Sequence, residues 1–280
     1  MTVSEGAGDA DAYGWFSPPD LDILFAALTK LDNSGDVVLV GGQSLSFWVD
    51  WYDISFPKTD TPYLTQDADF LASRKDAEEL ARHLGGNLRL ATIDDFTPNT
   101  ATLVFDGVSG ERLLIDFLGV VVGLTAAEIR ANAVPVERDG QRIFILHPLL
   151  CLQSRISNLK ALPGKRNRNG IEQARVAVEV AKRYVSERLG NGEIRPALKA
   201  ANKVAAMAQS KDGVYVWERW DIDVLQAIDP DVFPDARFRQ VEWPKQVTKT
   251  KTKREKVENR KRQQAQGRVA YSPNRRGPSS

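Results

Sequence analysis

Three aspartates, Asp67, Asp69 and Asp116, are candidates for metal-binding residues. Asp67 and Asp69 are separated by one small residue in the apolar stretch 64–71, and side chains at positions i and i+2 of a strand point to the same side of a sheet. Asp116 interrupts a second apolar strand, 113–118, where an unpaired charge would be costly. Like charges this close repel one another unless a cation lies between them. The pattern predicts a site for a divalent ion, Mg²⁺ or Mn²⁺, of the kind that carboxylates, water and substrate phosphates bind.

A glycine turn lies upstream of these acids. The β-branched run 37–40 favours a buried strand, and Gly41 and Gly42 end it. Apolar residues in 45–51 are spaced for a helix that packs on that strand. The sequence therefore predicts a strand, a glycine turn and a helix in succession.

Each of these features also has a simpler explanation. Gly41 and Gly42 could serve only as a strand-to-helix turn. Asp67 and Asp69 could be charges on an edge strand, where they would discourage aggregation. Asp116 is harder to explain in this way, because an acid among so many apolar residues needs a partner or a metal.

The order and strand context of the motifs carry a resemblance to a known family. The motifs are, in chain order, Gly41-Gly42-x-Ser44, Asp67-x-Asp69 and a lone Asp116 on a later strand. Together they resemble the nucleotidyltransferase superfamily with the polymerase-β-like core, in particular its bacterial AbiEii-type branch, known from toxin–antitoxin and phage-defence systems. The resemblance covers roughly residues 20–190. The gap before the first acid is longer than usual and leaves room for an insertion at 52–63.

The resemblance implies an enzyme, a Mg²⁺-dependent nucleotidyltransferase. It would move a nucleotide from an NTP onto an acceptor, which could be RNA, as a toxin or defence protein with a cognate antitoxin protein as partner. Asp67 and Asp69 would bind the metal, and Asp116 would complete the catalytic triad as metal ligand or general base. The alternative is a non-catalytic nucleotidyltransferase-like module that binds a nucleotide, RNA or a protein.

The resemblance also implies a set of phosphate-binding residues. The glycine turn and Ser44 would hold the triphosphate, because glycine lets phosphate approach the backbone and a helix N-terminus attracts anions. The counterparts of the family's basic residues are Arg155, Lys165 and Arg166. Arg155 stands where the family usually has a lysine, and a guanidinium grips phosphate in two places but is a poorer general acid. The other interpretation of the basic run is a solvated interhelical loop.

The predicted elements divide the chain near residue 147. Before it the sequence predicts helices at 21–31 and 73–84, a strand at 88–92, and hairpins at 100–118 and 134–146. After it the sequence predicts helices at 149–162, 171–189, 196–209 and 216–228. We therefore expect an α+β fold in four parts: a disordered lead-in at 1–16, a mixed-sheet nucleotidyltransferase-like domain at 17–147, a helical domain at 148–244 and a disordered basic tail at 245–280.

Charge sets the tail apart from the rest of the chain. About 12 Lys and Arg residues but only about 2 Glu lie in 245–280, so the remainder is acidic although the net charge is +1. With few apolar residues, such a segment cannot bury enough surface to offset its ordering entropy. It suits a mobile electrostatic arm for polyanions such as RNA, or alternatively a solubilising appendage without a ligand.

Composition excludes several classes of protein and site. A hydrophobic content of 42% with 27% charged residues is that of a soluble globular protein. No apolar run approaches the roughly 18 residues that cross a bilayer, and the N-terminus lacks a signal-peptide pattern, so we expect a cytoplasmic protein without a membrane partner. The single cysteine, Cys151, excludes an internal disulfide and a cysteine zinc cluster, and the two histidines are too few for a histidine-based metal site.

Overall fold

The structure, a computed structural model, describes residues 13–32, 34–55, 67–92, 94–95, 98–138 and 140–270. Most of the expected lead-in, most of the expected insertion and residues 271–280 lie outside this part of the chain. The first elements are α1 (Pro18–Leu28), β1 (Val38–Leu39), α2 (Gly41–Trp51), β2 (Ala68–Leu71), α3 (Arg74–Leu84), β3 (Asn87–Leu90), β4 (Asn99–Asp106), β5 (Arg112–Leu118), α4 (Ala126–Asn132), β6 (Val134–Arg138) and β7 (Gln141–Ile145). The later helices are α5 (Pro148–Ala161), α6 (Arg168–Gly190), α7 (Ile194–Ala208), α8 (Lys211–Trp220) and α9 (Trp243–Ala270).

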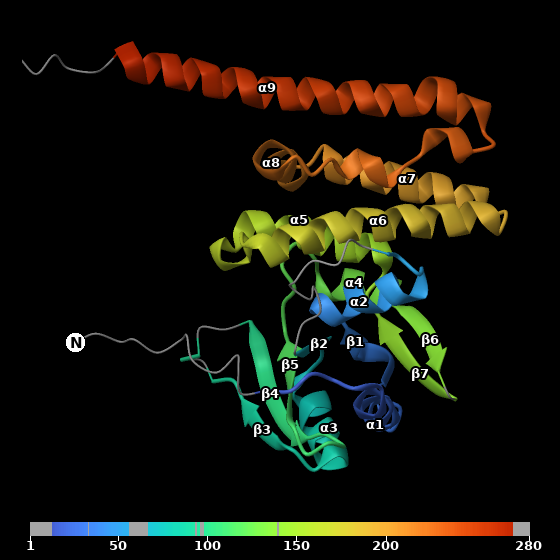
Figure 1. The fold of residues 1–280 in the computed structure, drawn as a ribbon, viewed down its shortest axis with the longest axis vertical. Coiled ribbons are helices and arrows are strands. Elements are labelled where there is room, and N and C mark those ends of the chain that lie inside the picture. The colour runs from blue at the N-terminus through green and yellow to red at the C-terminus, as the bar shows by residue number, and fades with distance from the viewer. Residues whose placement is uncertain are drawn as a thin grey trace, which may run out of the picture.

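The strands of the described residues form one seven-stranded mixed sheet in the order β3-β4-β5-β2-β1-β7-β6 (Figure 1). β2 runs parallel to β5 and β1 runs parallel to β7, whereas the other neighbours are antiparallel. The α+β fold with a mixed sheet is therefore confirmed. Because β2 is paired on both sides, the interpretation of Asp67 and Asp69 as edge-strand charges is wrong.

Alternation along β4 and β5 separates a buried face from an open one. Leu103 on β4 and Ile115 and Phe117 on β5 are fully buried, and α3 packs against β4. The intervening side chains, among them Thr102 and Asp116, are partly exposed on the opposite face. The period of two that apolar residues show in the sequence thus places an acid on the accessible side of a stable hairpin.

The C-terminal helices stack in layers on the sheet (Figure 1). α5 and α6 pack on α2, which itself contacts the sheet, α7 and α8 follow, and α9 is outermost. His147 begins the first of these helices, since its ring nitrogen accepts a hydrogen bond from the Leu149 N–H at 3.1 Å. One buried apolar core runs from the sheet into the helices. The division into two domains near residue 147 stays a prediction.

The helix expected at 216–228 lies earlier in the chain. α8 begins after Ser210, which accepts a hydrogen bond from the Gly213 N–H at 3.0 Å, and it ends at Asp221, whose φ of 53° is left-handed. A short 3₁₀ turn at Val224–Ala227 follows. The apolar spacing continues through this turn, which is why the pattern alone misplaced the helix.

The basic segment is helical where the structure describes it. α9 begins at Trp243, so the prediction of disorder from residue 245 is wrong for 245–263. Its composition remains strongly polar, and no described helix is long and apolar enough to cross a membrane. The prediction of disorder rested on the small number of apolar residues in this segment. Its polar side chains instead form hydrogen bonds with other parts of the chain.

A polar seam holds α9 on the helices beneath it. Thr250 is fully buried, and Gln246 accepts a hydrogen bond from Gln209 at 2.9 Å. Arg254 grips Asp223 with two hydrogen bonds of 3.0 and 2.5 Å. Charge-assisted pairs of this kind are stronger than neutral hydrogen bonds, so a few of them can anchor a helix with little apolar surface.

Candidate functional site

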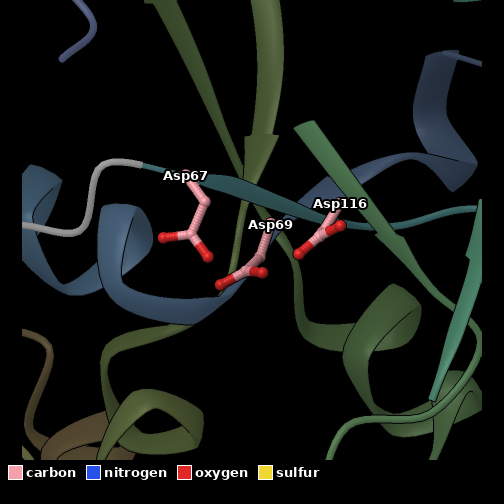
Figure 2. A group of neighbouring side chains, drawn as sticks. All are labelled: Asp67, Asp69 and Asp116. Atoms are coloured by element: carbon pink, nitrogen blue, oxygen red, sulfur yellow. The ribbon is translucent and has the colours of Figure 1, made fainter. Parts of the chain in front are cut away.

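The three predicted acids meet at one point (Figure 2). One carboxylate oxygen from each of Asp67, Asp69 and Asp116 lies within 4.8 Å of the other two. The sheet brings this about, because Asp69 on β2 is directly opposite Asp116 on the parallel strand β5, and Asp67 precedes Asp69 by two residues. The predicted convergence is confirmed, and these carboxylates could hold a divalent metal ion.

Burial raises the pKa of two acids of the triad. Burial raises the pKa of Asp69 to about 7, and the Asp67 and Asp116 carboxylates act in the same direction. The positive charges of Arg155 and Lys165 oppose this shift without cancelling it. Burial also raises the pKa of Asp116. Burial and the neighbouring acids thus favour the protonated form of Asp69, and a divalent cation bound to its carboxylate would favour the ionised form.

Two hydrogen-bond donors orient Asp116. The Asn99 amide donates to Oδ1 at 2.8 Å, and the Thr102 hydroxyl donates to the same oxygen at 3.0 Å. Both side chains also line a pocket of about 510 Å³ whose other lining residues include Arg89 and Arg112. Since both hydrogen bonds end on Oδ1, the second carboxylate oxygen is left for a metal or a proton.

The glycine turn is packed against the triad. Gly41 adopts a left-handed φ of 65°, and a Cβ at this position would overlap the Asp69 carboxylate. Only glycine meets both requirements. Gly42 is buried in the first turn of α2, so this helix begins beside the acids. The positive end of the helix dipole makes the same corner attractive to an anion.

Ser44 points into the protein core. Its side chain is fully buried, its hydroxyl donates to the Gly41 carbonyl at 3.0 Å, and it lies 3.6 Å from the Cys151 thiol of α5. Burial raises the pKa of Cys151 to about 11, which suits a structural thiol. Ser44 thus secures the start of α2 against α5, and its predicted contact with the triphosphate stays a prediction.

Arg155 lies buried beneath the acids. Only 7% of it is exposed, and its Nη1 donates to Oε1 of Gln173 at 2.9 Å. Its Nε has no hydrogen-bond partner among the described residues. Burial lowers the pKa of Arg155, while Asp69 and Asp67 act in the opposite direction. Arg155 is therefore an internal counter-charge to the triad.

The predicted basic loop contributes two side chains with different surroundings. Lys165 is exposed, and its charge acts on Asp69. Arg166 donates to the carbonyls of Leu159 and Lys160, at 3.0 and 2.7 Å, and its guanidinium lies 5.7 Å from the centre of the Tyr215 ring. Arg166 thus caps the end of α5. A role for either residue in nucleotide binding stays a prediction.

Sequence reasoning missed three polar partners of the site: Asn99, Thr102 and Gln173. Thr102 had a usable signal, because the short turn of the predicted hairpin 100–118 fixes the register that places it opposite Asp116. Asn99 lies at a register shift at the start of β4, and Gln173 depends on how α6 packs on α5. Neither follows from a local pattern.

Comparison with known proteins gives little beyond a weak structural likeness. No protein-family model and no curated protein matches the chain. Among solved structures it is similar to an antigenic nucleotidyltransferase-like protein from Paracoccidioides brasiliensis, with 12% identity and a TM-score of 0.38 over 66% of this chain and 94% of that one. It is also similar to JHP933 from Helicobacter pylori, with 14% identity and a TM-score of 0.33 over 90% of this chain and 99% of that one. At such TM-scores any functional argument rests on the geometry of the site.

Proposed function

We propose that this protein is a Mg²⁺-dependent nucleotidyltransferase with a polymerase-β-like core. The observation that carries the proposal is the convergence of Asp67, Asp69 and Asp116 beside the N-terminus of α2. One corner of the sheet thus offers carboxylates for a metal and backbone N–H groups for phosphate. Nucleotidyl transfer needs both, because its attacking, transferred and leaving oxygens carry negative charge that must be held in place.

The donor set fits a hard divalent ion. Carboxylate oxygens are the ligands that Mg²⁺ and Mn²⁺ prefer, and a bound ion would oppose the burial and the neighbouring negative charges that raise the pKa of Asp69. When bound, the ion supplies charge stabilisation of the phosphates and lowers the pKa of an attacking hydroxyl. Asp67 and Asp69 would hold it. Asp116, oriented by Asn99 and Thr102, would act as a further ligand or accept the proton of the attacking hydroxyl.

The nucleotide would enter over the glycine turn. Gly41, in a left-handed conformation, begins α2 beside Asp69, and the first turn of α2 would present its N–H groups to the triphosphate. Lys165 and Arg166 would contribute positive charge from the loop, and Arg155 would add it from below Asp69. Ser44 would act by holding the turn in shape.

The pocket beside Asp116 supplies a place for the acceptor. Its lining joins amides, hydroxyls, the guanidinium of Arg112 and the Arg89–Asp95 ion pair, which suits an acceptor that carries both hydroxyl and phosphate groups, such as RNA. By the resemblance to AbiEii-type proteins, the enzyme would serve as a toxin or defence protein in the cytoplasm, with a cognate antitoxin protein as its partner.

Transfer of label tests this proposal. Purified protein would be incubated with each α-³²P-labelled NTP, Mg²⁺ and total RNA, and the products separated by size. We expect Mg²⁺-dependent labelling of RNA by the wild type and by Asp106→Asn, a control at the exposed end of β4. We expect none from Asp69→Asn. Binding of NTP without transfer by the wild type would instead support the non-catalytic module.

A further inference from the structure

A groove between α8 and α9 combines an apolar floor with basic walls. Its volume is about 380 Å³, and Val214, Tyr215 and Val257 provide apolar surface. The charged residues that line it are Lys211, Glu218, Lys253, Lys256 and Arg260. Glu218 pairs with Lys261, so the acid in the groove is already compensated. The groove is therefore a positively charged site with room for apolar groups.

The basic residues on the α9 side form a stripe. Lys249, Lys253, Lys256 and Arg260 recur every three or four residues and so lie on one side of the helix. At a rise of 1.5 Å per residue, the stripe is about 16 Å long. Within the described residues, only Lys253 among them has a hydrogen bond, donated to the Gln209 carbonyl at 2.9 Å, and none makes an ion pair. Uncompensated charge of this length suits an extended polyanion better than a single phosphate.

Tyr215 connects this groove to the acidic triad. Its ring lines the groove and carries the guanidinium of Arg166, 5.7 Å from the ring centre. Lys165 directly precedes Arg166 in the chain, and its charge acts on Asp69. Positive side chains therefore lead from the groove to the proposed site of nucleotidyl transfer.

We propose that the α8–α9 groove binds an extended single-stranded nucleic acid. Its phosphates contact the stripe of Lys249, Lys253, Lys256 and Arg260, and base faces rest on the apolar floor, the combination that single strands use on proteins. In the part of this inference that rests on the proposed function, the bound strand is the acceptor and its end reaches the triad past Lys165. An acidic peptide would share the charge complementarity but would have no phosphate end to deliver to the triad.

Two matched double variants test the groove. Lys256→Ala with Arg260→Ala removes two charges from the stripe, and Lys251→Ala with Arg262→Ala removes two exposed charges from the other flank of α9. The probe is a fluorescein-labelled single-stranded RNA of mixed sequence, titrated by anisotropy across a KCl series without NTP or Mg²⁺. The groove variant should bind about tenfold more weakly. The magnitude of the slope of log K against log[KCl] should decrease by roughly 1.4, since each phosphate contact with a single strand contributes about 0.7 to that slope. The flank variant should match the wild type.

Three outcomes would overturn the proposal: equal affinity and slope in both double variants, no RNA binding by the wild type, or displacement of the RNA by polyglutamate at equal charge concentration. The last would assign the groove to an acidic peptide. Thermal unfolding of each variant separates lost binding from lost folding. Because this titration contains neither NTP nor Mg²⁺, a failure of transfer chemistry would leave the binding result intact.

Discussion

Burial acts on a carboxylate both in the acidic triad and in the polar seam beneath α9, but the resulting pKa shifts have opposite directions. At the triad, burial and neighbouring acids raise the pKa of Asp69 to about 7. In the seam, burial acts to raise the pKa of Asp223, yet the hydrogen bonds from Arg254 outweigh it and hold that pKa below its usual value. A charge with its partner in the chain belongs to the scaffold. At the triad, the metal and nucleotide of the proposed function would supply the counter-charge from outside the chain.

The largest expected effect is on activity at the triad. Asp69→Asn removes a metal ligand, and we expect the transfer rate to fall by at least about 10³-fold, as for the loss of a major electrostatic contact in a transition state. The melting temperature should stay the same or rise, because carboxylate repulsion is relieved. Initial rates and thermal melts measure both effects. Asp106→Asn is the control, and an active Asp69→Asn enzyme would remove this residue from the site.

The next effect is on stability in the seam. Arg254→Ala leaves the Asp223 carboxylate without its partner, and we expect a loss of about 3 kcal/mol in the free energy of unfolding. Lys251→Ala, an exposed change on the same helix, should stay within about 0.5 kcal/mol of the wild type. Urea unfolding compares the two variants. Similar small losses would show that α9 does not depend on the ion pair.

The pH dependence of stability should differ between the two regions. Asp69 has a folded-state pKa of about 7 against an ordinary 3.8, so the folded state holds the proton more tightly. Its contribution to stability is present below about pH 4 and is lost as the pH rises through 7, at about 1.4 kcal/mol per unit of pKa shift. The pKa of Asp223 is lowered, so its contribution is present above the ordinary value and is lost only as the pH falls through the folded value.

Urea unfolding of metal-free protein between pH 4 and 8 measures the contribution of Asp69 as the difference between wild type and Asp69→Asn. As the pH rises, the wild type should become progressively less stable than Asp69→Asn. At pH 8, added Mg²⁺ should reduce this difference in stability. Parallel stability curves for the two proteins would mean that Asp69 is not destabilised in the folded state. Asp106→Asn should follow the wild-type curve.

The smallest expected effect is at a hydrogen bond that supports the triad. Thr102→Val removes one donor to Asp116 and keeps the side-chain shape, and we expect kcat to fall about fivefold, the equivalent of roughly 1 kcal/mol. Thr100→Val is the matched control, because Thr100 donates to the Phe117 carbonyl and not to the acid. Steady-state kinetics should place the loss in kcat rather than in the KM for NTP. Equal losses in both variants would indicate a general effect on β4.

The elements near the triad could be predicted because local patterns determine them. The alternation that buries Ile115 and Phe117 also exposes Asp116, and the spacing of Asp67 and Asp69 places both on one side of β2. The sequence could not reveal that Arg155 would be buried, since that depends on how α5 packs against α2 and α6. Arg166 was predicted to bind phosphate. In the structure its guanidinium donates to a carbonyl at the end of α5, a contact that the sequence did not reveal.

The helix α9 shows the limit of composition as a guide. Lys, Arg and Gln in 245–263 gave no apolar period, yet Thr250 and Arg254 are buried at helical spacing. Thr250 donates to the Gln246 carbonyl within α9, and Arg254 pairs with Asp223 on the layer beneath. Such pairing is specified by residues far away in the chain, among them Gln209 and Asp223. A prediction of order from the tail alone would have required knowledge of that surface.

Calorimetric titration of the protein with Mg²⁺ at pH 8, in the presence of a non-hydrolysable NTP analogue, tests most directly whether the three acids bind metal once the heat of a protein-free titration of the same analogue is subtracted. We expect saturable binding beyond that reference by the wild type and by Asp106→Asn, and none by Asp69→Asn. Equal binding by all three proteins, or no saturable binding by the wild type, would contradict the assignment of Asp67, Asp69 and Asp116 as a metal site.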